Sequence, residues 1–190
     1  MKTPKYFFTI PFLIICICLG AYLPNQFLGK PTLEVQSIYP AHTIDSLTKI
    51  ADRIIVGEVV ERGPTKKVKI PVSTEIDVDD RNKGQFVEDI VTEVKIKVTD
   101  PLKNSKKDEI ISYYEEGGET EQAIFIPEGG RINKREEVLI FINEHGYSWG
   151  PQSVIKSLND KYQVEFHNDK GSYDKSVLKN RIKEILEKKQ

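Results

Sequence analysis

The chain has 190 residues, of which 30% are charged and 38% are hydrophobic, and its formal net charge is −1 at pH 7. This hydrophobic share is enough to build a core and argues against a chain that is disordered throughout. The near-neutral balance argues against a general binder of nucleic acid or anionic lipid, because such affinity depends on excess positive charge.

The first 29 residues contain an apolar, uncharged segment, Tyr6–Leu23, behind a short basic stretch with Lys2 and Lys5. A helix of this length spans roughly 27 Å, about the thickness of the hydrocarbon core of a membrane. Lysines before the segment, with none after it until Lys30, favour an N-terminus inside and a body outside. We therefore expect residues 1–29 to be a transmembrane or signal helix that carries the rest of the chain out of the cytoplasm.

Sequence leaves open whether this segment is kept or cut off. The small residues Gly20 and Ala21 suit signal peptidase, but the length of the segment favours an uncleaved membrane anchor. A lipoprotein is the weakest alternative, because the residue before Cys16 is Ile15, which is not small. Both cysteines of the chain lie in this segment, so the body needs no disulfide and has no thiolate metal site. Cysteine-free exported bodies are common among Gram-positive bacteria.

The exported body divides into a tether, residues 30–41, and one domain, residues 42–190. Scattered prolines and a lack of periodicity predict the tether. At the start of the domain, Thr43 is placed to cap a short helix, Ile44–Asp52.

The next segment, Arg53–Glu61, predicts a strand buried on both faces, with a bulge at Gly57. Residues 63–87 are polar and predict an extended hairpin or an insertion between strands. Ile90–Val98 alternates apolar and charged side chains, which predicts a strand with one packed and one wet face. We expect Asp100 and Pro101 to end that strand.

Five further strands are expected in the rest of the domain: Asp108–Tyr114, Gln122–Ile126, Glu137–Asn143, Ser153–Ser157 and Tyr162–His167. A terminal helix of about Asp174–Lys188 follows, and we expect it to pack on the strands. Its apolar stripe contains Val177, Leu178, Ile182, Ile185 and Leu186. These elements predict a mainly β fold, a small β-barrel with one early and one terminal helix, because closure buries both faces without open edges.

Several motifs resemble an OB-like family of exported bacterial domains. The segment Ala51–Val60 (ADRIIVGEVV) resembles the family's first strand; the alternating strand, Leu102-Lys103-Asn104, the pair Gly117-Gly118 and Arg135–Ile142 (REEVLIFI) follow in the family's order. That order is similar to the OB-fold barrel of tissue inhibitors of metalloproteinases and of netrin-type modules, and it covers roughly residues 44–166. The resemblance implies an OB-like barrel. Those inhibitors act through an N-terminal Cys-x-Cys arrangement, and the body here has no cysteine, so no inhibitory residue is carried over.

Three patterns could carry chemistry, and each favours a structural interpretation. In Asp77–Gly84, Arg81 stands where an EF-hand loop needs an oxygen ligand, so we expect a solvated turn. The acidic run Glu115–Glu121 contains a glycine pair, so we expect an exposed turn rather than a rigid catalytic platform. The histidines (His42, His145 and His167) are isolated, and the sequence has no nucleophile, nucleotide-binding or zinc motif. We therefore expect no catalytic residue, no metal and no cofactor.

Tyr147 and Trp149 are the candidate binding residues, because they lie in the glycine-containing loop His145–Pro151 and aromatic side chains dominate binding hot spots. The alternative, which we favour from sequence alone, is that Trp149 plugs one end of the barrel. We expect a non-enzymatic binding domain, membrane-anchored or secreted, that contacts an envelope or extracellular protein and not nucleic acid. The alternative function is an exported enzyme or enzyme inhibitor whose site has no sequence motif.

Overall fold

The computed structural model describes residues 29–35, 37, 39–71 and 86–188. The apolar segment Tyr6–Leu23 and the segment Asp77–Gly84, which was compared with an EF-hand loop, lie outside these ranges. The described part is mainly β and carries two α-helices, α2 (Ile44–Ile50) and α3 (Lys175–Glu187), which confirms the expected class and both helices. Neither of these helices is long and apolar enough to cross a membrane.

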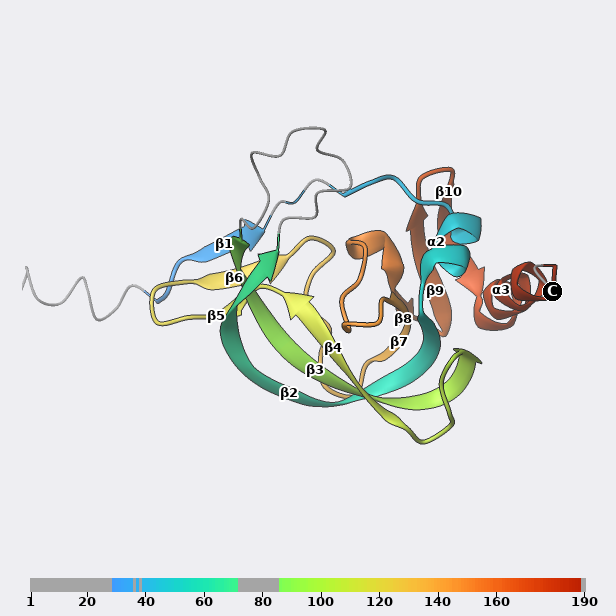
Figure 1. Ribbon diagram of the computed structural model, residues 1–190, viewed down its shortest axis with the longest axis horizontal. Coiled ribbons are helices and arrows are strands. Elements are labelled where there is room, and N and C mark those ends of the chain that lie inside the picture. Colours follow the sequence, from blue (N-terminus) through green and yellow to red (C-terminus); the bar gives the residue numbers. More distant parts are fainter. Residues whose placement is uncertain (1–28, 36, 38, 72–85, 189–190) are drawn as a thin grey trace, which may run out of the picture.

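The described strands form two sheets (Figure 1). The larger one is antiparallel, in the order β10-β9-β8-β7-β2-β3-β4. Its strands are β2 (Arg53–Pro71), β3 (Phe86–Lys103), β4 (Ile110–Glu116), β7 (Glu137–Ile142), β8 (Val154–Leu158), β9 (Lys161–Phe166) and β10 (Asp169–Asp174). The smaller one has the order β1-β6-β5, from Thr32–Val35, Ile124–Pro127 and Gly118–Glu119.

The closed barrel that we expected is not formed, because the larger sheet has two edges, β10 and β4. Beyond β7 the sheet continues through β8, β9 and β10, and none of the described strands pairs with the free edge of β4. A loop takes that place instead, and the Tyr114 backbone N–H donates to the Gly146 carbonyl at 2.9 Å. The sheet is therefore a half-barrel whose gap is bridged by the segment that follows β7.

Strong curvature of β2 and β3 produces the concave side of this half-barrel (Figure 1). The register between the two strands shifts between Val56 and Gly57, which confirms the predicted bulge. A Cβ at Gly57 would lie 2.5 Å from the Ile96 Cγ2 atom, so only glycine allows this close approach. The strands stay paired out to Pro71 and Phe86, which confirms the extended hairpin over the described residues.

The prediction that Pro101 ends β3 is wrong, since the strand runs on to Lys103 and Pro101 pairs with Ile55. The partner on the other side, β4, pairs with β3 only from Val91 to Lys97. Beyond that point one edge of β3 has no partner strand, and the β2–β3 register shifts beside Pro101. A residue without an N–H is tolerated at such an edge or irregularity.

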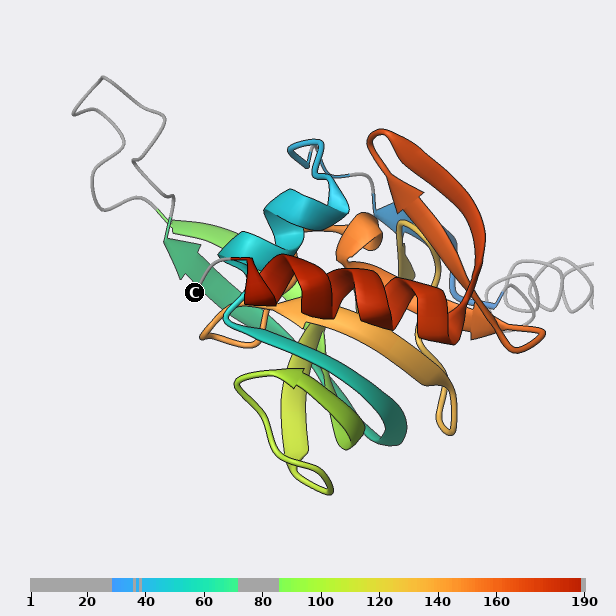
Figure 2. The ribbon, with the colours of Figure 1, turned by 90° about the vertical axis from the view of Figure 1, so that its right-hand side faces the viewer.

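Two hydrophobic cores lie on opposite faces of the central strands β2 and β7, because successive strand residues point to opposite sides. The helix-covered core contains Ile44, Leu47, Ala51, Ile54, Val56, Leu139, Phe141, Ile155, Tyr162, Val164, Phe166, Leu178 and Ile182. The concave core contains Ile55, Val59, Val94, Ile96, Val98, Ile111, Tyr113, Ile132, Val138, Ile140 and Ile142. Figure 2 shows α3 lying across the sheet with α2 beside it. The prediction of a central strand at Glu137–Asn143, apolar on both faces, is confirmed.

Both helices follow from local sequence. In α2, Thr43 and Ser46 form a capping box, in which the Ser46 N–H donates to Thr43 Oγ1 at 3.1 Å and the Thr43 N–H to Ser46 Oγ at 2.9 Å. In α3, Leu178 and Ile182 are buried as predicted, and the packing of this helix on the strands is confirmed. Val177 is 53% exposed, so its place in the apolar stripe is wrong.

Three strands were not expected, β1, β5 and β10. β1 lies inside the segment predicted as a tether and pairs in parallel with β6, Thr32 opposite Ile124. β10 forms the outer edge of the larger sheet. β5 falls inside the predicted turn Glu115–Glu121. β5 and β10 show no apolar alternation, while Thr32–Val35 does alternate but has only four residues and no buried side chain.

Candidate functional site

A pocket of about 940 Å³ lies at one end of the concave core. Buried side chains of that core, Tyr113 and Ile132, together with Val91, line its apolar part. The rest of the lining comes from residues 37 and 39, from the segments 127–130 and 143–151, from β8 and from the ends of β2, β3 and β4. The pocket is therefore the open end of the half-barrel, where no strand covers the concave face.

Residues 37 and 39 cross from β1 toward α2 and are held against the end of β4. The Tyr39 hydroxyl donates to one carboxylate oxygen of Glu116, and the Ser37 hydroxyl donates to the other at 2.6 Å. The Tyr39 ring lies directly on Gly150, where a Cβ would be 2.4 Å from the ring, and Gly150 has a φ of +85° that also favours glycine. Burial and the adjacent Glu116 carboxylate raise the pKa of Tyr39, so its phenol stays neutral.

Asn143 organises the loop that carries the predicted binding residues. Its side-chain oxygen accepts from the backbone N–H groups of His145 and Tyr147, both at 3.0 Å. The Tyr147 ring packs on Tyr114 with centroids 5.2 Å apart and planes 31° apart. Burial and nearby Tyr114 and Asp89 raise the pKa of Tyr147.

Trp149 lies in the same loop and is half-buried. Its side chain packs against the helix-covered core and also lines the pocket, so it contacts both regions. The Trp149 backbone N–H donates to Ser153 Oγ at 2.9 Å, which fixes the loop where it turns into β8. The structure thus brings Tyr147 and Trp149 into one lining, and their role in binding stays a prediction.

Other lining residues were not selected from the sequence. They are Tyr39, Tyr114, Asp89 and Glu116, which join the two predicted aromatics in the pocket. The only local signal is the run Tyr113–Glu116, two tyrosines followed by two glutamates on one strand. Burial raises the pKa of the Asp89 carboxyl, Glu116 raises it further, and the Ile90 N–H that donates to Asp89 at 2.7 Å opposes the shift.

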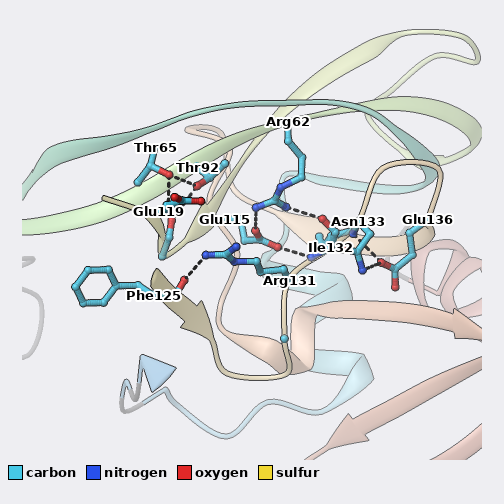
Figure 3. Close-up of polar contacts among 12 residues, drawn as sticks. Arg62, Thr65, Thr92, Glu115, Glu119, Phe125, Arg131, Ile132, Asn133 and Glu136 are labelled. Atoms are coloured by element: carbon cyan, nitrogen blue, oxygen red, sulfur yellow. Dashed lines mark hydrogen bonds and ion pairs between the residues drawn. The ribbon is translucent and has the colours of Figure 1, made fainter. Parts of the chain in front are cut away.

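Glu115 departs from the exposed turn that we expected for Glu115–Glu121, since only 3% of its surface is exposed. Its two carboxylate oxygens accept from Arg62 Nη2 and from the Ile132 backbone N–H (Figure 3), each at 2.6 Å. Arg62 also donates to the Ile132 carbonyl. This network holds residues 131–133 against β2 and β4 and satisfies charges that would otherwise be buried alone.

Lys156 ties the adjacent loop to β8. Its ammonium donates to the carbonyl oxygens of Gly129, Gly130 and Arg131 at 2.7, 2.8 and 2.9 Å. Burial lowers the pKa of Lys156. All three ammonium hydrogens are therefore committed to the backbone.

The three histidines do not come together in one site: His42 and His167 are neighbours through their backbones, and His145 lies in the loop that lines the pocket. His145 is exposed and its Nε2 is 3.4 Å from the Glu144 carboxylate, while the His42 carbonyl accepts from the His167 N–H at 3.0 Å. Within the described ranges, no group of three His, Cys, Asp or Glu side chains is arranged to hold a metal ion.

No protein-family model, no curated protein and no solved structure matches this chain. The pocket itself is therefore the basis for an inference about function.

Proposed function

We propose that this chain is a non-enzymatic binding domain, displayed outside the cytoplasmic membrane, that takes part of an envelope or extracellular partner into the pocket. One observation carries the proposal: four half-buried aromatic side chains, Tyr39, Tyr114, Tyr147 and Trp149, surround a partly apolar hollow. Its volume of about 940 Å³ lies within the range of roughly 300–1,000 Å³ that is usual for ligand sites. Aromatic anchors of this kind dominate recognition energetics.

Binding is favoured over catalysis by how the polar groups are held. Glu116 accepts from two neutral hydroxyls, and the raised pKa values of Tyr39 and Tyr147 keep both phenols neutral. His145 lines the pocket, but its ring is exposed and its Nε2 atom lies 3.4 Å from the Glu144 carboxylate rather than on a carboxylate of the pocket. Fixed donors and acceptors of this kind suit recognition, whereas catalysis needs an acid and a base set against a reacting atom.

The proposed location is supported by the apolar segment Tyr6–Leu23 behind Lys2 and Lys5. The proposed OB-like relationship is supported by the antiparallel order β4-β3-β2-β7 around a curved first pair, with the barrel left open. Protease added to intact cells tests the location: cleavage of the body is expected, and full protection would contradict it. Mass spectrometry of the mature N-terminus then separates an anchor from a signal peptide, because a chain that starts at Ala21 or Tyr22 has been cleaved.

Site-directed photo-crosslinking tests the binding proposal in the cells that make the protein. The full chain carries p-benzoylphenylalanine in place of Tyr147 or, as a control, in place of Val177, which is 53% exposed on α3 and is not part of the pocket lining. We expect discrete adducts at Tyr147 that are absent at Val177. Identical adducts at the two positions, or none at Tyr147, would contradict a binding role for the pocket.

A further inference from the structure

The pocket lining contains more acid than base. Its carboxylates are Asp89, Glu115, Glu116 and Glu128, and its cationic side chains are Lys69 and Lys156. Two of these charges are already committed, because Glu115 is paired with Arg62 and Lys156 donates to three carbonyl oxygens. Three carboxylates and the exposed Lys69 remain, so the lining is net negative.

These three carboxylates have no cationic partner in the part of the chain that the structure describes. Among the described residues, none of Asp89, Glu116 and Glu128 takes part in an ion pair. Glu116 is held by hydroxyl groups, which position its charge without neutralising it. Burial makes the negative charge of Asp89 costly, and its pKa is raised accordingly. A cation entering the pocket would offset that cost.

Aromatic faces complete the lining. Tyr39, Tyr114, Tyr147 and Trp149 surround the same space as the carboxylates. The face of an aromatic ring is electrostatically negative and attracts cations, most strongly for Trp. Rings and carboxylates together therefore select against an anionic ligand, and a neutral ligand would leave the carboxylate charges uncompensated.

On this basis we infer that the pocket binds an organic cation, an ammonium or guanidinium group, held by the carboxylates of Asp89 and Glu116 and by the rings of Tyr147 and Trp149. The inference rests on the proposed binding function and names the chemical class of its ligand. The cation is supplied either by a lysine or arginine side chain of a peptide or by a free amine. An amphipathic stem on the cation suits the apolar part of the pocket formed by Val91 and Ile132.

The chain itself provides the reporter for a test, because Trp149 is its single tryptophan. The full chain in detergent micelles is titrated with Nα-acetyl-lysine amide, Nα-acetyl-arginine amide and n-butylamine, and Trp149 emission and calorimetry are followed. Nα-acetyl-norleucine amide is the matched neutral control, since it keeps the aliphatic stem and lacks the ammonium. A short lysine-containing peptide then separates a peptide source from a free amine, according to which of the two binds more tightly.

Variants assign the effect to the carboxylates. Asp89→Asn and Glu116→Gln each remove a charge at nearly constant shape, and we expect each to weaken cation binding on the order of tenfold. Glu144→Gln removes a carboxylate that is 74% exposed and lies outside the lining, and we expect no change. Tyr39→Phe removes the hydroxyl from Glu116 while keeping its charge, so retained binding in this variant separates the charge from the packing of residues 37 and 39.

The inference holds if the three cationic probes bind, norleucine amide does not, and Asp89→Asn loses affinity. It is overturned if the cationic probes fail to bind, or if norleucine amide, a neutral saccharide or Nα-acetyl-glutamate amide binds as tightly as they do. If one of these neutral or anionic probes binds as tightly, the pocket still binds a ligand, so the proposed function stands and only the inferred ligand class is wrong. If crosslinking at Tyr147 also yields no discrete adduct, both are wrong.

Discussion

The two faces of β2 and β7 are closed in different ways. On one face, α2, α3 and β9 cover the helix-covered core, in which the largest side chains, Phe141, Tyr162 and Phe166, are fully buried. On the other face, curvature of β2 and β3 encloses the concave core, and one end stays open as the pocket. The same two strands therefore supply a dry interior on one side and a polar, charged opening on the other.

This difference follows from what covers each face. Amphipathic helices satisfy their own backbone hydrogen bonds, so they cover an apolar face without bringing polar groups into it. Loops do not, and the concave face ends at loops whose N–H and carbonyl groups need partners. Glu115, Arg62 and Lys156 provide those partners, so charged side chains lie at the open end.

The largest expected effect comes from the helix-covered core. Phe141 is fully buried and meets Phe166 edge-on, with centroids 6.5 Å apart. We expect Phe141→Ala to lower the free energy of unfolding by about 3–5 kcal/mol, because it removes buried surface and leaves a cavity. Urea denaturation followed by circular dichroism measures the loss. A loss of about 1 kcal/mol or less would show that this core is not tightly packed.

The second-largest effect is expected in the ion pair between Arg62 and Glu115 at the open end of the half-barrel. We expect Arg62→Met to lower the free energy of unfolding by about 3 kcal/mol, because Glu115 is left buried without its counter-charge. Lys95→Met removes a partner from the exposed pair Lys95–Glu61 and is expected to cost much less, because water and salt screen an exposed ion pair. Equal losses in the two variants, measured by urea denaturation, would contradict a structural role for the buried pair.

A substitution at Gly57 tests the close approach of β2 and β3, whose curvature encloses the concave core. We expect Gly57→Ala to destabilise the fold by about 2 kcal/mol, because the new Cβ would lie 2.5 Å from Ile96 Cγ2 and 2.7 Å from the Lys97 carbonyl oxygen. Gly63→Ala is the control on the same strand, since its nearest neighbour is the Glu93 carbonyl oxygen at 3.4 Å. Thermal melting compares them, and a stable Gly57→Ala chain would mean that β2 and β3 need no close approach there.

The smallest expected effect has the opposite sign. Burial raises the pKa of Asp89 above its ordinary value of 3.8, so the native state binds the proton more strongly than the unfolded chain. The carboxylate therefore costs stability at pH values above the folded pKa, and the cost is absent below 3.8, where both states are protonated. Because solvent screens the charge of this half-buried carboxylate, we expect Asp89→Asn to raise the free energy of unfolding by only about 0.5 kcal/mol or less at pH 7 and not at about pH 3.

Denaturation at the two pH values checks this prediction, with Glu144→Gln as the control. A destabilised Asp89→Asn chain at pH 7 would show that the carboxylate contributes to folding rather than to the pocket. Increased stability together with weaker cation binding would show that the open end keeps a charge at the expense of stability.

Much of the secondary structure was predictable because its signals are local. Thr43 caps α2 through a residue three positions away, and the alternation in Ile90–Val98 appears as buried Thr92, Val94, Ile96 and Val98. Glu137–Ile142 has nearly every residue buried, as its unbroken apolar run predicts. These patterns predict the structure correctly because backbone geometry sets the periods of helices and strands.

Burial of charge and the pairing of irregular segments were not predictable in this way. Glu115 lies in an acidic, glycine-containing run that is typical of an exposed turn, and it is buried because Arg62, 53 residues earlier, reaches its carboxylate. β1 is a strand only because β6 lies beside it. Pro101 stays in β3 because β4 stops short of it. Each outcome depends on a partner far away in the chain.

The sequence by itself determined the mainly β class, both helices, the central strands and the choice of Tyr147 and Trp149 as candidates, because hydropathy period, capping and aromatic content are properties of neighbouring residues. The tertiary structure decided that the barrel stays open and that Tyr39, Asp89, Tyr114 and Glu116 join those two aromatics in one pocket. The physical reason is that closure of a sheet and assembly of a site depend on which distant segments bury each other.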